Sequence, residues 1–223
     1  MSILYDDLPV VYGTGEILHD EKTNWTDLKL KSEAVATAMG EEITDYWIKR
    51  SEKVLDCGAV LHFAVSKNSM RLIKAFFCRD RMCPSCQKRR SLMIFHQVKS
   101  VCISIQKEQP TIKYLMLTLT VPNVKASELK ETISHMMKSW GKLIKRKEFK
   151  TSIKGWFRAL EITYNGERDD YHPHFHILLS VNSGYFKKNY ITQNRWLELW
   201  QESTKNFNIT QVDVRRVKPN PKK

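Results

Sequence analysis

The sequence predicts an α+β fold in which an antiparallel sheet, with helices on one face, follows a small module of four cysteines that binds zinc. Three observations predict it. In the second half of the chain, apolar and polar residues alternate in segments whose order is strand, helix, strand, strand, helix, strand, and this order is typical of an antiparallel sheet with its helices on one side. Four cysteines lie within residues 57–86, and three histidines lie within residues 172–176. The expected division is an N-terminal arm and helices over 1–53, the zinc module and a basic helix over 54–110, and the sheet domain over 111–223.

The chain is strongly basic, with 37 Lys and Arg against 24 Asp and Glu in 223 residues, which gives a formal net charge of +13. Such an excess suits a partner that carries dense negative charge, and nucleic acid is the leading candidate. The sequence has no run of about 18 apolar residues, and Asp6 and Asp7 lie where a signal peptide would carry basic residues. A cytoplasmic protein without a membrane partner is therefore expected. In that reducing compartment, clustered cysteines are interpreted as metal ligands rather than disulfides.

The first half of the chain is expected to be less regular than the second. Residues 1–30 are polar and lack clear periodicity, and they predict an extended or disordered arm. Over Asp27–Lys53 the apolar residues fall near helical spacing, and Gly40 interrupts them, which indicates one or two helices. Two short apolar runs within 54–86 indicate a pair of strands that ends in a turn. An amphipathic helix with a basic first turn is expected over Arg89–Glu108.

The elements of the sheet domain follow from the period of their apolar residues, which is two in strands and about 3.6 in helices. The segment 165–174 is rich in charged and turn-forming residues and is expected to be the loop between the second and third strands. Strands are expected at Lys113–Val121, Gly155–Tyr164, Phe175–Val181 and Ile209–Val217, and helices at Ser127–Lys147 and Trp196–Phe207.

Four thiols are predicted to form one structural zinc site. Cys83 and Cys86 are separated by two residues, a spacing that lets two thiolates reach one tetrahedral ion, and Cys57 and Cys78 would complete the shell. Cys57 is spaced more widely than in a standard zinc ribbon, so His62 is the substitute ligand. Five cations near these cysteines are expected to contact DNA phosphates, and the alternative is a solvated basic face. They are Arg79, Arg81, Lys88, Arg89 and Arg90.

A second metal site is predicted at the histidines near the third strand. In a strand, side chains two residues apart share a face, so His174 and His176 point to the same side while Phe175 turns into the core. Glu161 lies between apolar residues in the preceding strand, and pairing of the two strands would bring its carboxylate to the imidazoles. Two histidines and one carboxylate leave coordination positions open for a substrate, as a catalytic ion requires. His172 lies at the entrance of the strand and is expected to support the site or to contact phosphate.

Three sequence blocks resemble, in the same order, the replication initiators of small rolling-circle plasmids of bacteria, which belong to the HUH endonuclease superfamily. The blocks are 81–90 (RMCPSCQKRR), 117–123 (LTLTVPN), and 160–165 (LEITYN) together with 172–176 (HPHFH). The resemblance covers residues 54–217 and implies that the sheet domain is an HUH palm, which has a ferredoxin-like sheet.

The resemblance implies a site-specific endonuclease that acts on single-stranded DNA. A divalent metal, manganese or magnesium, held by His174, His176 and Glu161, would polarise a phosphodiester while a tyrosine attacks it. The implied partners are plasmid origin DNA, single-stranded or as a hairpin, and host replication proteins. Initiators of this family carry the nucleophile on a helix after the last strand, and no tyrosine follows Tyr190 in this sequence. The nucleophile is therefore expected beyond Lys223, and the chain is expected to be a truncated form that binds metal and DNA without nicking by the usual route.

Two tyrosines near the last predicted helix are not interpreted as the nucleophile, and three functions are alternatives to an initiator. Tyr185 and Lys188 reproduce the spacing of the family's tyrosine and lysine, but they precede the last predicted helix, so they and Tyr190 are interpreted as loop or DNA-contacting residues. One alternative is a non-catalytic protein that occupies a plasmid origin, which the missing tyrosine favours. Another is a transposase or relaxase of the same superfamily, although the cysteine module favours an initiator. A metal-dependent hydrolase unrelated to DNA is disfavoured by the positive charge.

Overall fold

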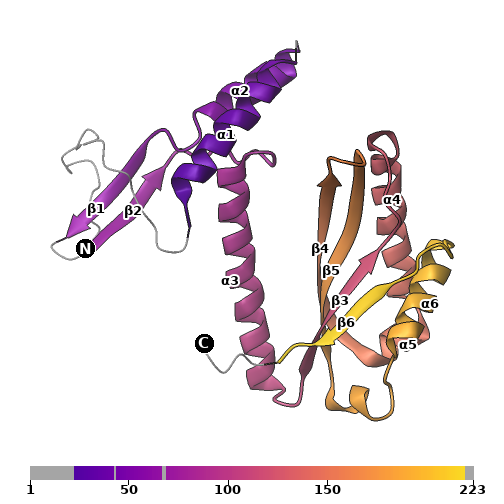
Figure 1. Cartoon of the computed structure of the whole chain (residues 1–223). Coiled ribbons are helices and arrows are strands. Elements are labelled where there is room, and N and C mark those ends of the chain that lie inside the picture. Colours follow the sequence, from indigo (N-terminus) through magenta and orange to yellow (C-terminus); the bar gives the residue numbers. More distant parts are fainter. Residues whose placement is uncertain (1–22, 43, 67–68, 219–223) are drawn as a thin grey trace. The chain divides into compact units, whose positions relative to one another are not determined.

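The fold is known from a computed structural model of the chain, which forms two compact units, Met1–Gln97 and Val98–Lys223 (Figure 1). The structure describes residues 23–42, 44–66 and 69–218. The arm expected over residues 1–30 lies outside the described residues as far as residue 22. The prediction that the arm extends to residue 30 is wrong, because the first helix begins at Trp25.

The first unit contains two helices, a hairpin and the start of a third helix. Its elements are α1 (Trp25–Gly40), α2 (Asp45–Leu55), β1 (Leu61–Ser66), β2 (Ser69–Ala75) and the beginning of α3 (Pro84–Glu108). β1 and β2 pair antiparallel, as the two apolar runs predict. The core formed by the described residues of this unit is small: Ala36, Met39 and Val54 pack together with Cys57 and Cys83. Two of the four clustered cysteines are therefore part of the core rather than of the surface.

The second unit contains a four-stranded sheet in the order β4-β5-β3-β6, in which every neighbouring pair is antiparallel. Its elements are β3 (Lys113–Thr120), α4 (Ala126–Leu143), α5 (Lys147–Ser152), β4 (Ile153–Asn165), β5 (Asp170–Val181), the short 3-10 helix η2 (Ser183–Phe186), α6 (Gln193–Thr204) and β6 (Val212–Arg216). This order and pairing confirm the predicted α+β class with an antiparallel sheet. Within the described part of the chain, no helix combines the length and the apolar character that crossing a lipid bilayer requires.

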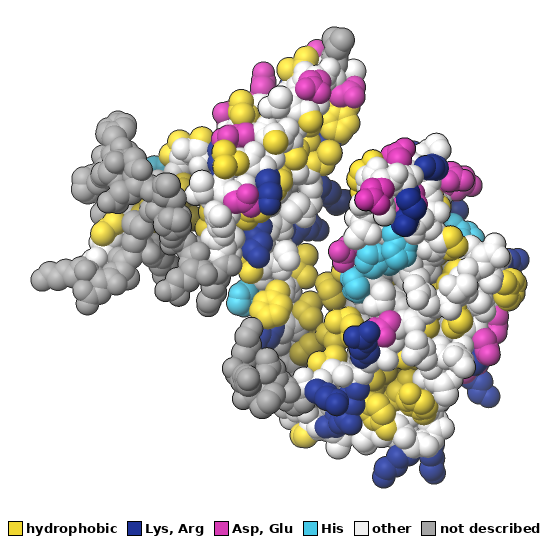
Figure 2. Space-filling model, in the orientation of Figure 1, with side chains coloured by type: hydrophobic (Ala, Val, Ile, Leu, Met, Phe, Trp, Pro, Cys, Tyr) yellow, Lys and Arg dark blue, Asp and Glu magenta, His cyan; other side chains and the backbone are white. Residues whose placement is uncertain are grey.

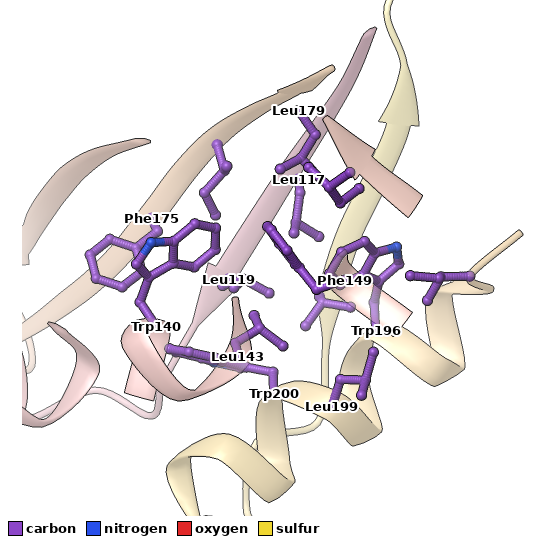
Figure 3. Packing of buried hydrophobic residues seen from close by; sticks show 14 of the residues in the cluster. Leu117, Leu119, Trp140, Leu143, Phe149, Phe175, Leu179, Trp196, Leu199 and Trp200 are labelled. Carbon is purple, nitrogen blue, oxygen red and sulfur yellow. The ribbon is translucent and has the colours of Figure 1, made fainter. Parts of the chain in front are cut away.

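One face of this sheet forms the core with α4, α5 and α6 (Figure 3). Alternate residues of the two central strands, among them Leu117 and Phe175, are fully buried there. Trp140 of α4 meets Phe175 edge to face, with ring centroids 6.4 Å apart. Trp200 of α6 donates a hydrogen bond from Nε1 to the carbonyl of Thr120, at 2.7 Å, so that the core helix also fixes the end of β3. Each such buried side chain stabilises the fold by about 1.5–3 kcal/mol relative to an exposed one.

The other face of the sheet carries the intervening residues, and we call it the histidine face. It is defined by Thr118 and Thr120 of β3, Glu161 of β4, and His172, His174 and His176 of β5. The antiparallel register places Thr118 opposite His176 and Thr120 opposite His174. On the other side of β5, Glu161 is opposite His174.

Two elements of the second unit differ most from the prediction, and α3 begins at Pro84 rather than at the expected Arg89. β5 begins at Asp170, so the segment expected to be a loop is shortened to a tight turn and His172 lies inside the strand rather than at its entrance. Pairing with β4 continues to Asn165, opposite Asp170, and it overrides the polar composition of this segment. Pro173 is tolerated because β3 pairs no further than His174, so no β3 residue lies opposite the proline. The helix expected over 127–147 is divided into α4 and α5, since three residues after Leu143 leave the helix.

Candidate metal centres

Glu161, His174 and His176 come together on the histidine face. The carboxylate Oε2 of Glu161 lies 3.0 Å from Nε2 of His176 and 3.6 Å from Nε2 of His174. The three ligand atoms all lie within 4.8 Å of one another. His174 is nearly buried, while the side chains of His176 and Glu161 are 42% and 54% exposed. The group therefore has a fixed base and an accessible side, and its two imidazoles and one carboxylate fit a divalent ion with free positions.

The two imidazoles are held with Nε2 directed toward the carboxylate. Nδ1 of His174 lies 3.0 Å from the backbone carbonyl of His172, which can only accept a hydrogen bond, so Nδ1 carries a proton and Nε2 is the atom that could bind a metal. Nδ1 of His176 lies 3.3 Å from the hydroxyl of Thr118. Such outer hydrogen bonds fix ring orientation and tautomer in metal-binding histidines.

His172 lies beside this group without joining it. Its Nε2 is hydrogen-bonded to the hydroxyl of Thr120, and its ring centroid lies 5.1 Å from that of His174. Burial, and to a smaller extent the neighbouring His174, holds the pKa of His172 below its usual range. The neutral form of this ring is therefore favoured.

The four clustered cysteines come together in the first unit. Cys57 follows α2, Cys78 follows β2, and Cys83 and Cys86 flank the start of α3. Sγ of Cys86 lies 3.5 Å from that of Cys57 and 3.6 Å from that of Cys78, and all four sulfurs lie within 4.8 Å of one another. A tetrahedral zinc ion with bonds of about 2.3 Å would separate its sulfurs by roughly 3.8 Å. The four sulfurs therefore fit one such ion. His62, the substitute ligand, lies on β1 and is exposed.

Backbone N–H groups point at the sulfurs. Cys57 accepts a hydrogen bond from the N–H of Cys78, Cys86 accepts one from Arg79, and Cys78 accepts one from Asp80. These donors stabilise thiolate over thiol, and they arise from the turn at Arg79, whose φ is 59°. Burial raises the pKa of Cys57 to about 11. Burial also acts to raise the pKa of Cys83, but hydrogen bonds from the Cys86 N–H and from Ser32 outweigh it and lower that pKa.

The five basic residues expected to contact DNA surround the cysteine cluster. Four of them are exposed and Lys88 is partly exposed. Arg89 is the most restrained, because its guanidinium lies over the ring of Phe77, 3.5 Å from the centroid. The structure thus keeps all five cations accessible to a phosphate backbone.

Sequence reasoning missed Thr118 and Thr120 as site residues. Both lie in a block that carries the resemblance, and strand alternation would have assigned them to the face of His174 and His176. Tyr185, expected in a loop or on DNA, is fully buried, and its hydroxyl donates to the carbonyl of Ile191 at 3.2 Å. Its interpretation as a DNA-contacting residue is therefore wrong, because the core of the second unit covers it.

The sheet and its histidine face define an α+β protein with a candidate catalytic metal site and a separate candidate zinc site, and histidine side chains reach the visible surface of the second unit (Figure 2). A family model described as "Replication protein" matches residues 69–223. The chain belongs to this family. The resemblance to replication initiators of rolling-circle plasmids is thereby confirmed.

Curated relatives support the same family. A "Protein rep" of Bacillus sp is 45% identical over 175 residues, which cover 78% of this chain and 57% of the relative. A second, from Bacillus amyloliquefaciens, is 42% identical over 204 residues, with 89% and 60% covered. A third, from Staphylococcus aureus, is 42% identical over 174 residues, with 76% of each covered. The chain thus spans about 60% of the length of the first two relatives. No solved structure matches the chain.

Proposed function

We propose that the chain supplies the metal-binding and DNA-binding part of a plasmid rolling-circle replication initiator, which binds the double-strand origin and nicks one strand. The observation that carries this proposal is the group of Glu161, His174 and His176 on an accessible face, with both imidazoles oriented. A divalent ion held there would act as a Lewis acid on the phosphodiester of the strand. Two imidazoles favour manganese over magnesium on ligand softness.

The chain's own residues would perform three tasks at this site. Glu161 offers a carboxylate oxygen, and the imidazoles of His174 and His176 offer nitrogen ligands. Thr118 and the carbonyl of His172 keep the rings in place, so that no reorganisation is needed when the strand arrives. The exposed side of the carboxylate leaves room for a phosphate oxygen.

In the first unit, Cys57, Cys78, Cys83 and Cys86 would hold a structural zinc ion. That ion would make the turn between β2 and α3 rigid, because ligands come from both of its ends. The basic residues around it would then bind phosphates in fixed positions, with host replication proteins as further partners of the initiator. Phosphate contacts of this kind position the protein and give affinity that falls with salt.

Glu161, His174 and His176 form a triad, and the tyrosines of the described sheet do not offer an attacking hydroxyl beside it. Tyr114 is on the histidine face, but it lies four residues from Thr118, about 13 Å along the strand, and its hydroxyl donates to the carbonyl of Cys102. Strand alternation places the side chains of Tyr164 and Tyr171 on the face of Leu160 and Phe175, opposite to that of the triad. We therefore expect this chain to bind metal and single-stranded DNA without nicking it. The same observation favours the second candidate function, occupation of a plasmid origin without catalysis.

The test combines a labelled single-stranded hairpin oligonucleotide with the chain and manganese. We expect manganese to strengthen binding at least about tenfold, and Glu161→Gln to remove that increase, whereas the exposed His62→Ala keeps it. A denaturing gel should show an intact strand and no protein-linked product. A covalent adduct would contradict the expected lack of nicking. DNA affinity that manganese does not change would contradict the proposal that the triad holds the metal.

A further inference from the structure

Beside the triad, the surface of the second unit forms a hollow of about 260 Å³ that the proposed mechanism does not use. Its polar lining comes from the end of β3, from β5 and from the loop before β6, and we call it the amide hollow. The polar residues are Thr120, Asn123, His172, Asn208, Thr210 and Gln211. Asp, Glu, Lys and Arg are absent from its lining. An uncharged group that forms hydrogen bonds therefore suits it better than a phosphate does.

The amide hollow lies in register with the metal ligands. Thr120 is paired with His174 across β3 and β5, and Leu119 is paired with Val212 across β3 and β6. Because this pairing is antiparallel, Gln211 comes opposite Thr120, so that Gln211, Thr120 and His174 lie side by side across the sheet. Two strand spacings separate Gln211 from His174, about 10 Å in all. A strand whose phosphate is at the triad would bring a neighbouring base to this hollow.

The loop that forms one wall is fixed by its backbone and by one buried side chain. Ile209 is 2% exposed, and its carbonyl accepts a hydrogen bond from Gln201 of α6 at 2.7 Å. The N–H of Asn208 donates to Asn206 at 3.0 Å. The wall is thus shaped before any ligand binds, which lowers the entropy cost of binding.

The side chains on this rigid loop keep their hydrogen-bonding groups free. Asn208, Thr210 and Gln211 are exposed, and among the described residues they have no side-chain hydrogen bond. Ile209 and Val121 lie beneath them but are almost fully buried, so the groups that a ligand would meet are mainly polar. Amide and hydroxyl groups at the rim of the hollow match the polar edge of a nucleobase, which both donates and accepts hydrogen bonds.

We propose that the amide hollow binds the base of a nucleotide next to the phosphate at the triad, with adenine as the preferred base. Asn and Gln side chains pair with the N6 and N7 edge of adenine through two hydrogen bonds, and Asn208 and Gln211 offer that chemistry. The proposal rests on the proposed function, because it needs a single strand at the triad. It adds a determinant of which base lies beside the reacting phosphate.

The test measures binding by fluorescence anisotropy with manganese present, using oligonucleotides of roughly 12 nucleotides, a length common for single-strand sites. The probes are oligo(dA), oligo(dT) and an abasic strand of equal length. The wild-type chain should bind oligo(dA) roughly tenfold more tightly than the abasic strand. The double variant Asn208→Ala/Gln211→Ala should lose that preference and bind the abasic strand as the wild type does. Asn194→Ala, which removes an exposed amide from α6, should change nothing.

The two proposals fail in different ways. If the double variant keeps the full preference for oligo(dA), the amide hollow does not bind the base, whatever the triad does. If manganese leaves binding of every strand unchanged, including the abasic one, the proposed function fails and this inference fails with it. Since the three altered side chains form no hydrogen bonds among the described residues, the variants should fold, and equal circular dichroism spectra check this.

Discussion

The ligand geometry at the histidine face depends on residues that would not touch a metal themselves. Nε2 of His176 reaches Glu161 because Nδ1 on the other side of the ring is bonded to Thr118. His174 is held in the same way by the carbonyl of His172. In both rings Nδ1 is bonded within the sheet, and Nε2 faces the carboxylate of Glu161, with which it could share a metal ion. Strand register and local hydrogen bonds together therefore set the chemistry that these histidines can perform.

At the scale of the residue, Thr118→Val tests this orientation. The substitution keeps the shape of the side chain and removes the hydroxyl, so the His176 ring loses its partner, and manganese affinity should fall about 10- to 100-fold. Isothermal titration calorimetry measures the change. Thr163→Val on β4, which alters a threonine without a bond to either ligand, is the matched control. Equal losses in both variants would mean that Thr118 does not position His176.

At the scale of the element, the pattern of apolar residues predicted the strands and helices of the second unit, while two boundaries were not readable from it. β5 begins early because its pairing with β4 extends to the turn, and a partner strand is not encoded in the local composition of Asp170–His174. The predicted candidate ligands Glu161, His174 and His176 do come together, since period-two alternation and hairpin pairing suffice to place them. Thr118 and the amide hollow required the register between β3 and β5 and the path of the loop before β6.

The contact between α5 and α6 gives a pH-dependent prediction. Glu148 of α5 is paired with Arg195 of α6 at 2.7 Å, and this hydrogen bond holds the pKa of Glu148 below its ordinary value of 4.5. A lowered pKa in the folded state means that the stabilisation is present above that ordinary value and is lost as the pH falls through the folded value. Both side chains are more than a third exposed, so the contribution is reduced by solvent to about 0.5 kcal/mol.

Glu148→Gln should therefore lower the free energy of unfolding near neutral pH and have no effect in strong acid. Urea unfolding followed by circular dichroism, at several values between about pH 7 and pH 3, measures the difference from the wild type. Glu131→Gln, which alters a glutamate of α4 without an ion pair among the described residues, should show no such trend. A loss from Glu148→Gln that is equal at every pH would contradict the ion pair as its cause.

At the scale of the whole molecule, the two units differ in what stabilises them. The second unit has a continuous apolar cluster that runs from the sheet to α4, α5 and α6. Among its described residues, the first unit has only a few buried apolar side chains besides its cysteines. A core of that size gives only marginal stability unless a bound metal or a disulfide adds to it. Structural zinc contributes folding free energy on the order of 10 kcal/mol in small modules, so the first unit should depend on it.

Cys83→Ser should therefore unfold the first unit selectively. Hydrogen exchange with mass spectrometry should find rapid exchange in peptides from residues 25–97, while peptides of the sheet in the second unit stay protected. A strong zinc chelator should reproduce this in the wild type. Cys102→Ser, which alters the cysteine outside the cluster, should leave both units protected. Unchanged protection after Cys83→Ser and after chelation would contradict the predicted zinc site.

The central claim is that Glu161, His174 and His176 hold a divalent ion, and a titration with manganese tests it most directly. Electron paramagnetic resonance measures the free ion as it is added to the zinc-loaded chain. The wild type and the control His62→Ala should each remove a single ion per chain from solution, and Glu161→Gln and His176→Ala should bind it at least about tenfold more weakly. If the wild type removes no manganese, or the variants bind it as tightly as the wild type does, the histidine face is not a metal site.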